Sequence, residues 1–200
     1  MKRKVALFDF DNTIANGDTI KRLVIYDLKK KPYHVIYFVC VAIYYLGYML
    51  KFNSFEKAKS YLLFPLRSMS EKECQKFYKE YVEPYYYSNV VEELKQKKED
   101  GYFVIVCTAS TEKYMKYCEL PIDAMLGTIY ENKKIIGKNC KNEEKIPRIL
   151  SCLKENSIED IDYENSYGYS DSNADIPMLS LVKNKKRVLL KTGTIVDFKE

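Results

Sequence analysis

The chain has 200 residues, of which 46% are hydrophobic and 30% charged. This balance is ordinary for a globular protein and excludes a mainly disordered or collagen-like chain. The length fits one domain, or one domain with a modest insertion. The net charge of +5 is well short of that of a dedicated nucleic-acid binder. We therefore expect no nucleic-acid partner and only a small bias toward anionic substrates or lipid surfaces.

The cysteines and the histidine give no metal-binding pattern. The six cysteines lie at least 11 positions apart, and His34 is the single histidine. These spacings exclude C-x-x-C and zinc-finger motifs. The sequence begins with basic residues and then a short apolar run that ends in acidic residues, which does not resemble a signal peptide. We expect a reduced, cytoplasmic protein with free thiols.

The first predicted element is a buried strand at residues 4–10 (KVALFDF), which is followed by turn-forming residues. From residue 19 to about residue 87 the pattern is helical. From residue 89 onward, predicted strands and helices alternate, with strands at 102–108, 123–127, 166–170, 187–191 and 194–198, helices at 89–101, 111–119 and 146–156, and a hairpin at 130–137. This alternation predicts an α/β fold with a mainly parallel sheet. The predicted core comprises residues 1–16 and 88–200, and residues 17–87 form a helical cap inserted after the first strand.

The residues at the carboxyl ends of the predicted strands are candidates for the site, because ligands bind there in open parallel sheets. The first strand ends in Asp9-Phe10-Asp11. Side chains two positions apart in an extended chain point the same way, so Asp9 and Asp11 project together. Two carboxylates in one pocket repel each other, and burial raises their pKa values. A divalent cation removes most of this penalty, and Mg²⁺ prefers such oxygen ligands together with water.

Two later segments add polar groups to the same edge of the sheet. The second strand ends in Thr108-Ala109-Ser110, at the expected start of a helix, where a hydroxyl and free backbone N–H groups can bind a phosphate. A later strand ends in a segment that contains Asp171 and Asp175, which adds two carboxylates.

A lysine can supply positive charge opposite an aspartate and a phosphate. Lys145 lies at a predicted helix start and can take this role.

These motifs, in this order, resemble those of the haloacid dehalogenase-like (HAD) superfamily. The segment 170–179 (SDSNADIPML) and the helical insertion after the first strand resemble its phosphoserine-phosphatase-like branch. The motifs span residues 9–175, whereas the insertion resembles the family only in position and helical character. The resemblance implies a Rossmann-like parallel-sheet core and a Mg²⁺-dependent phosphatase acting on a small phosphorylated substrate.

The resemblance also implies roles for individual residues. Asp9 would be the nucleophile that forms an aspartyl-phosphate, and Asp11 would act as general acid and then as general base. Thr108 would bind the phosphate with the Ala109 N–H, beside Ser110. Lys145, or alternatively Lys141, would be the site lysine. The ligands of Mg²⁺ would be Asp9, Asp11, Asp171 and Asp175.

The sequence departs from the phosphoserine-specific members at the substrate contacts. These members place a Glu where Asp18 stands, which makes Asp18 a candidate substrate contact. They also carry a cap arginine that binds the substrate carboxylate, whereas the cap here has only Arg22 and Arg67. Ala174 replaces an Asn that is common in the family. Phosphoserine is therefore disfavoured as the substrate, and the alternatives are a phosphotransferase to an alcohol acceptor and a lipid-phosphate phosphatase.

The stretch 35–50 (VIYFVCVAIYYLGYML) has no charged residue and is flanked by basic ones. One interpretation is a buried helix of the cap, which base rates favour. Another is a helix that contacts a membrane surface or a lipid tail, in which case the protein would attach peripherally to the membrane. A single membrane span is a third interpretation, but the stretch is shorter than the roughly 20 residues that a span needs and lies inside an insertion.

Overall fold

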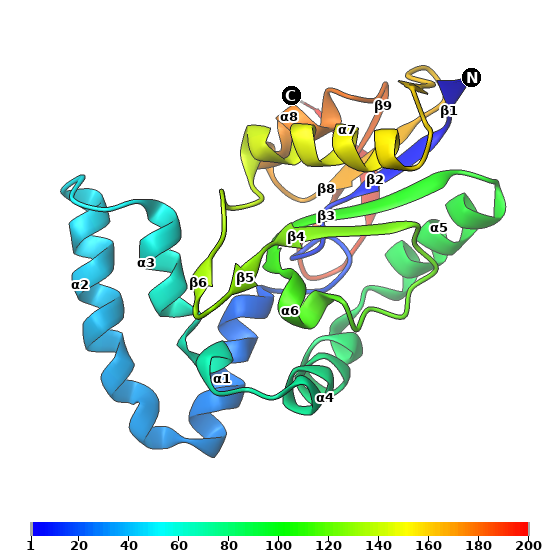
Figure 1. Ribbon diagram of the computed structural model, residues 1–200. Helices are drawn as coiled ribbons and strands as arrows, with labels where there is room; N and C mark the ends of the chain where they lie inside the picture. Colours follow the sequence, from blue (N-terminus) through cyan, green and yellow to red (C-terminus); the bar gives the residue numbers. More distant parts are fainter. Residues whose placement is uncertain (1, 200) are drawn as a thin grey trace.

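A computed structural model describes residues 2–199 (Figure 1). Its main sheet has six strands in the order β10-β9-β8-β2-β3-β4, and only the edge pair β10–β9 is antiparallel. The predicted α/β fold with a mainly parallel sheet is therefore confirmed. The strands of this sheet are β2 (Val5–Phe8), β3 (Phe103–Thr111), β4 (Ala124–Thr128), β8 (Tyr167–Ser170), β9 (Asn184–Val188) and β10 (Ile195–Asp197).

Two small pairs accompany the main sheet. β1 (Lys2–Arg3) pairs in parallel with β7 (Asp160–Ile161), and β5 (Tyr130–Glu131) forms a hairpin with β6 (Lys134–Ile135). The core helices are α5 (Ser88–Glu99), α6 (Glu112–Met115), α7 (Lys145–Glu155) and α8 (Ile176–Leu179), with the short turns η4 (Asn142–Glu144) and η5 (Asn173–Asp175).

The central strand β2 is buried on both faces, as its unbroken apolar sequence predicts. Its alternate residues face two different apolar clusters. Val5 and Leu7 pack with residues of α7 and α8, whereas Ala6 and Phe8 pack on the side that carries α5 and the cap. The sheet is thus covered by helices on both faces, and Figure 1 shows α7 and α8 on the side opposite the cap.

The chain between β2 and α5 is entirely helical or irregular, apart from isolated bridges. Its elements are α1 (Thr19–Lys30), η1 (Pro32–Ile36), α2 (Tyr37–Met49), α3 (Phe55–Leu62), η2 (Phe64–Arg67), α4 (Glu71–Tyr81) and η3 (Glu83–Tyr85). Backbone hydrogen bonds join the two ends of this insertion, from Asn16 N to Tyr85 O (2.8 Å) and from Tyr87 N to Ile14 O (2.9 Å). The insertion therefore leaves and re-enters the core at one place, directly after the first strand.

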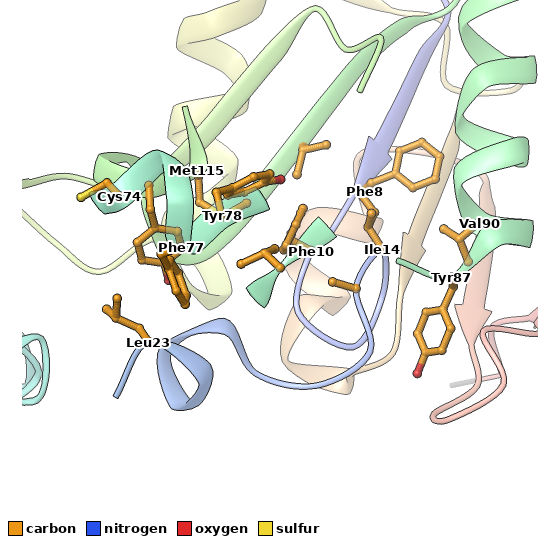
Figure 2. Close-up of a cluster of buried hydrophobic side chains, with 14 of the residues drawn as sticks. Phe8, Phe10, Ile14, Leu23, Cys74, Phe77, Tyr78, Tyr87, Val90 and Met115 are labelled. Atoms are coloured by element: carbon orange, nitrogen blue, oxygen red, sulfur yellow. The ribbon is translucent and has the colours of Figure 1, made fainter. Parts of the chain in front are cut away.

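Part of the insertion shares an apolar cluster with the core, as Figure 2 shows. Phe77 and Tyr78 of α4 lie with Leu23 of α1 against Phe10 and Met115 of the core, all of them buried. In contrast, α2 and α3 contribute to a separate small cluster around Val24, Val41 and Phe64. The helices α1 and α4 are thus fixed to the core by this cluster, α3 lies beside β6, and α2 is the outermost helix of the cap (Figure 1).

Two local expectations are wrong. Thr108-Ala109-Ser110 does not start a helix, because β3 continues to Thr111 and α6 is only four residues long. The helix dipole therefore does not contribute to phosphate binding there.

The stretch 35–50 is not a buried helix either, because Val41 is the only buried residue of α2. The segment Pro32–Met49 is long and apolar enough to cross a membrane by length and composition, and 11% of it is buried. By itself this is weak evidence for a span.

Candidate active site

Asp9 and Lys145 form a buried ion pair at the carboxyl end of β2. Lys145 Nζ donates to Asp9 Oδ1 at 2.7 Å, and Lys145 is 1% exposed. The parallel pairing of β2 with β8 places Asp9 beside Tyr169, whose carbonyl accepts from Asp9 N at 3.0 Å. Lys145 reaches the site from the first turn of α7. Lys141, the alternative site lysine, is exposed and lies in the wall of the adjacent cavity.

Asp11 is held on both carboxylate oxygens by neighbouring donors. Thr19 N donates to Asp11 Oδ1 at 2.8 Å, and Ser110 Oγ donates to Oδ2 at 2.6 Å. The intervening turn contains Asn12 in a left-handed conformation (φ 61°), and Asn12 Oδ1 accepts from Gly17 N at 2.9 Å. This turn brings α1 back over the site and fixes the orientation of the Asp11 carboxylate.

Thr13 connects the first strand to the loop after β8. Its hydroxyl lies 3.4 Å from Asp9 Oδ2 and 3.3 Å from Asp171 Oδ1, and it accepts from Asp171 N at 3.0 Å. A single hydroxyl therefore lies between two carboxylates that are 162 positions apart in the sequence. Asp9 and Asp171 are brought together as the motif order predicts.

Asp175 is engaged on both oxygens by the protein itself. Its Oδ1 lies 2.6 Å from Lys145 Nζ, and its Oδ2 accepts from Ser170 Oγ at 2.6 Å. This arrangement fixes the Lys145 ammonium between Asp9 and Asp175. The geometry makes Asp175 a partner of the lysine, whereas the sequence also suggested it as a metal ligand.

The three residues of the expected phosphate-binding segment lie in extended backbone at the end of β3. The Thr108 hydroxyl accepts from Ser110 N at 3.0 Å, which leaves its own proton to donate. The Ala109 carbonyl accepts from Lys59 Nζ at 2.7 Å and from Thr128 Oγ1 at 2.8 Å. Ser110 contacts Asp11, so the sequence placed it correctly at the site, but its hydroxyl serves the carboxylate.

The carboxylates of this site resist ionisation. Burial raises the pKa of Asp9 to about 7, with smaller contributions from the charges of Asp175 and Asp11 and an opposing one from Lys145. Burial and the charge of Asp18 raise the pKa of Asp11 to about 6, and burial also raises the pKa of Asp171. If all of these carboxyls ionised, the site would carry more negative charge than the Lys145 ammonium neutralises.

This charge balance fits a divalent cation. Within residues 2–199, no group of three or more His, Cys, Asp or Glu side chains is arranged to hold a metal ion. However, Mg²⁺ is commonly held by one or two carboxylates, with water completing its shell. The Asp9 and Asp171 carboxylates, which both approach the Thr13 hydroxyl, would supply such a pair, and a bound cation would relieve the cost of holding both charges in one site.

A cavity of about 550 Å³ extends from Asp11 toward α2. Its polar end is formed by Asp11, Asp18, Ala109 and Asn139, with lysine side chains beside them. The rest of its wall is apolar and comes from three cap helices, with Ile20, Val24, Ile25 and Leu28 from α1, Phe38 and Tyr45 from α2, and Phe55 and Leu62 from α3. The chemical site therefore opens into a long, mostly apolar space.

Asp18 lies at the start of α1 beside the cavity, whereas the two cap arginines stack on tyrosine rings. Asp18 is the N-cap of α1, where its carboxylate accepts from Lys21 N at 2.9 Å, and it also lines the cavity. Arg22 stacks on the Tyr85 ring and Arg67 on the Tyr61 ring, and neither lines the cavity. Among the described residues, no arginine lines this cavity.

Lys59 is a residue of this cavity that the sequence interpretation missed. It is 4% exposed, and its Nζ donates to Ala109 O (2.7 Å) and to Asn139 Oδ1 (2.5 Å). A signal was present, because Lys59 stands four positions after Phe55 and three before Leu62, on the apolar face of α3. A charged residue on such a face indicates a buried polar partner.

The comparisons with known proteins agree with this architecture. The family model for haloacid dehalogenase-like hydrolases matches residues 6–180. A search of curated proteins gives no significant match.

Solved structures also share the fold. A protein of unknown function from Bordetella pertussis Tohama I is similar with a TM-score of 0.73 and 19% identity, over 92% of this chain and 89% of that one. A phosphoserine phosphatase solved as a phospho-aspartyl intermediate analogue has a TM-score of 0.60 and 20% identity, over 92% and 86%. A phosphoserine phosphohydrolase-like protein from Francisella tularensis has a TM-score of 0.55 and 15% identity, over 91% and 85%. At these identities the likeness concerns the fold, which is that of the phosphoserine-phosphatase-like proteins, and with the family match it shows that this chain belongs to the haloacid dehalogenase-like hydrolases.

Proposed function

We propose that this chain is a Mg²⁺-dependent phosphomonoester phosphatase that works through an aspartyl-phosphate on Asp9. The observation that carries the proposal is the pairing of Asp9 with the buried Lys145, beside a second carboxylate, Asp11, whose orientation is fixed. A nucleophile and a proton donor on one rigid turn are what two-step phosphoryl transfer needs, because its catalysis is mostly positioning and electrostatic stabilisation.

In the first step, an Asp9 carboxylate oxygen attacks phosphorus, and the bond from phosphorus to the substrate alcohol breaks. The departing alkoxide takes a proton from Asp11. The pKa of Asp11, raised to about 6 by burial, lets this carboxyl hold a proton closer to neutral pH than an exposed aspartate does. The contacts from Thr19 N and Ser110 Oγ keep it oriented toward the cavity, where the alcohol would lie.

In the second step, water attacks the aspartyl-phosphate, and the bond between Asp9 and phosphorus breaks. Asp11, now ionised, takes the proton from this water. Lys145 stabilises the negative charge on Asp9 and on the phosphate throughout, and Asp175 keeps its ammonium in place. Thr108 would donate its hydroxyl proton to a phosphate oxygen. Mg²⁺ held by Asp9 and Asp171 would neutralise the carboxylates and the phosphate charge.

The substitution Asp9→Asn tests the nucleophile. It preserves shape but removes the attacking charge, so kcat for an aryl phosphate should fall by about a thousandfold or more. Asp197→Asn, at an exposed carboxylate outside the site, is the matched control and should retain full activity. Beryllofluoride with Mg²⁺ should inhibit the wild type as an analogue of the phosphorylated aspartate. Substantial turnover by folded Asp9→Asn protein would contradict the proposal.

A narrower candidate is a phosphatase for amphiphilic phosphate esters, of which lipid phosphates are one class. The cavity favours it, because the space next to Asp11 is lined mainly by apolar side chains of α1, α2 and α3. The alcohol that leaves phosphorus and takes its proton from Asp11 would lie in this space. An apolar chain there would be removed from water, whereas a short polar alcohol such as serine would leave the apolar wall uncovered.

A series of alkyl phosphates of increasing chain length tests this candidate. Each buried methylene should raise kcat/KM by up to about fourfold until the cavity is filled. Leu28→Asn, which makes the cavity wall polar, should flatten this dependence, whereas the exposed Leu150→Asn on α7 should not. A kcat/KM that is independent of chain length in the wild type would exclude the amphiphile and leave the phosphatase proposal intact.

A further inference from the structure

The outer side of the η1–α2 segment is an exposed apolar face. Its members recur at helical spacing, so they form one continuous stripe. Each has 55–83% of its surface exposed, namely Val35, Ile36, Val39, Ile43, Leu46, Met49 and Leu50, with Phe52 just beyond the helix. We call these eight residues the α2 face. Contiguous exposed apolar surface of this kind marks an interaction site in a soluble protein.

The opposite side of α2 is packed, so the exposure does not come from a detached helix. Tyr44 stacks on Tyr61 with ring centroids 3.5 Å apart, and Tyr45 and Tyr48 meet the Phe55 ring edge to face. Because one side of α2 packs against protein, lipid could contact only its other side. The α2 face therefore suits a partner surface that contacts the helix from one side.

Basic residues stand at both ends of the α2 face. Lys29, Lys30 and Lys31 precede it, Lys51 follows it, and no Asp or Glu occurs between Asp27 and Glu56. Within residues 2–199, no ion pair within 4 Å involves these four lysines. Lys31 Nζ instead donates to Ser68 Oγ at 3.0 Å, and Lys29 lies over the Tyr81 ring. Lys30 Nζ donates to Tyr26 Oη, and the more distant carboxylates of Glu73 and Glu80 attract its charge. No direct ion pair neutralises these lysines in the described part of the chain, so their positive charge can attract an anionic surface.

Aromatic rings at the two ends of the face point to the same kind of surface. Tyr33 is 68% exposed at one end, and Phe52 is 83% exposed at the other. Tyrosines with lysines around an apolar centre suit the boundary between lipid headgroups and acyl chains. A second copy of this chain is a poorer occupant, because pairing the face with itself would bring like charges together.

We propose that the α2 face is the docking surface of this protein for an anionic lipid bilayer, on which it lies without crossing. Its apolar residues enter the headgroup region while the lysines at its ends contact acidic headgroups. The cavity next to the active site is walled by Phe38 and Tyr45 of the same helix. The docking does not depend on catalysis, and its use in taking substrate from the bilayer rests on the function proposed above.

Cosedimentation of the full chain with vesicles tests the docking directly. The protein should bind vesicles of phosphatidylcholine mixed with phosphatidylglycerol and bind them less at high salt, because salt screens the lysines. Each engaged lysine should contribute about fivefold in affinity at low salt. Absence of binding to the mixed vesicles at both salt concentrations would overturn the proposal.

Paired variants identify the surface. Ile43→Gln with Leu46→Gln should abolish binding, and Lys29→Gln with Lys51→Gln should weaken it and reduce its salt dependence. The matched controls are Leu150→Gln with Leu190→Gln, and Lys95→Gln with Lys154→Gln, all exposed positions outside the α2 face, and these should bind as the wild type does. Neither Ile43 nor Leu46 lines the cavity, so turnover of a soluble aryl phosphate should be unchanged by the first pair. Wild-type binding by the Ile43/Leu46 variant would overturn the assignment.

Three further measurements separate this proposal from its alternatives. Asp9→Asn protein should bind vesicles as the wild type does, so a failed phosphatase assay leaves the docking result standing. Sedimentation velocity should show a monomer without lipid. A dimer that the Ile43/Leu46 variant breaks would show instead that the face binds a second copy. Protein that stays in the vesicle pellet after an alkaline carbonate wash would show a membrane span, and either result would overturn the proposal.

Discussion

Asp171 and Asp175 stand four positions apart in one segment, but the structure gives their carboxylates different partners. Asp171 shares the Thr13 hydroxyl with Asp9, whereas Asp175 is bound by Lys145 and Ser170. We therefore expect Asp171→Asn to raise the Mg²⁺ concentration for half-maximal activity by about tenfold or more. Asp175→Asn should lower kcat by about 10–100-fold with little change in that concentration, because it releases the lysine.

Steady-state kinetics over a range of Mg²⁺ concentrations checks this difference. Asp197→Asn serves as the control for the loss of one surface carboxylate. Equal changes in the half-maximal Mg²⁺ concentration for Asp171→Asn and Asp175→Asn would show that both aspartates bind the metal, as the sequence alone suggested.

The residues that the sequence identified share a simple physical basis. Asp9 and Asp11 follow a buried strand, and Lys145 and Asp171 lie where the chain returns to the same edge of the sheet, so chain order and strand polarity are enough to bring them together. The choice between Lys145 and Lys141 could not be made that way, because it depends on where α7 begins. Lys145 is in the first turn of that helix and is buried, while Lys141 lies before it and is exposed.

The helix α3 connects the cap to the active site through its buried face. Lys59 contacts Ala109 and Asn139, and Ser60 Oγ accepts from Ile135 N at 2.9 Å. Burial lowers the pKa of Lys59 from its ordinary value to about 8, so this side chain loses its charge as the pH rises through about 8. Because the charged form attracts an anionic ester, KM should rise across this range in the wild type.

The variant Lys59→Met removes the titrating group. Its KM should be higher than that of the wild type below pH 8 and should no longer rise through about pH 8, while Lys57→Met, at the exposed neighbouring lysine, should keep the wild-type profile. Initial rates at several substrate concentrations between neutral pH and pH 9 give these profiles. Persistence of the rise in Lys59→Met would assign it to another group.

The helix α2 shows why burial could not be predicted from composition. A helix packed in a core and a helix exposed on one side to lipid or to a partner have the same apolar residues, and an uncharged stretch of 16 residues contains no polar stripe to mark a solvent side. The two kinds of helix differ in how much of their surface is covered by other parts of the fold. Here α3 and part of α1 cover one side of α2, whereas the residues of the α2 face on its other side are exposed.

At the scale of the whole molecule, the chain is built in two unequal parts. A large apolar cluster joins the sheet, α5, α1 and α4 (Figure 2), whereas α2 and α3 meet α1 and η2 in a small cluster around Val24, Val41 and Phe64. The carboxylates of the site lie at the end of the sheet, and the apolar cavity wall comes in equal shares from α1 and from the α2–α3 pair. Half of this wall is therefore fixed to the core through α1, and α3 is held to the core by the hydrogen bonds of Lys59 and Ser60.

Cation binding should be measurable as stability of this whole molecule, independently of any substrate. Because the carboxylates of Asp9 and Asp171 converge only in the folded chain, Mg²⁺ held as proposed should bind the native state alone and stabilise it by about 2.7 kcal/mol at 100 times its dissociation constant. For a chain of this length that corresponds to a rise in melting temperature of roughly 5–10 °C. Ca²⁺ should also stabilise but support little turnover, because its bonds are longer and its ligands more numerous. Calorimetry at matched ionic strength measures the shift, which should nearly vanish in Asp171→Asn and persist in Asp197→Asn. An equal rise in the wild type and in Asp171→Asn would place the cation elsewhere.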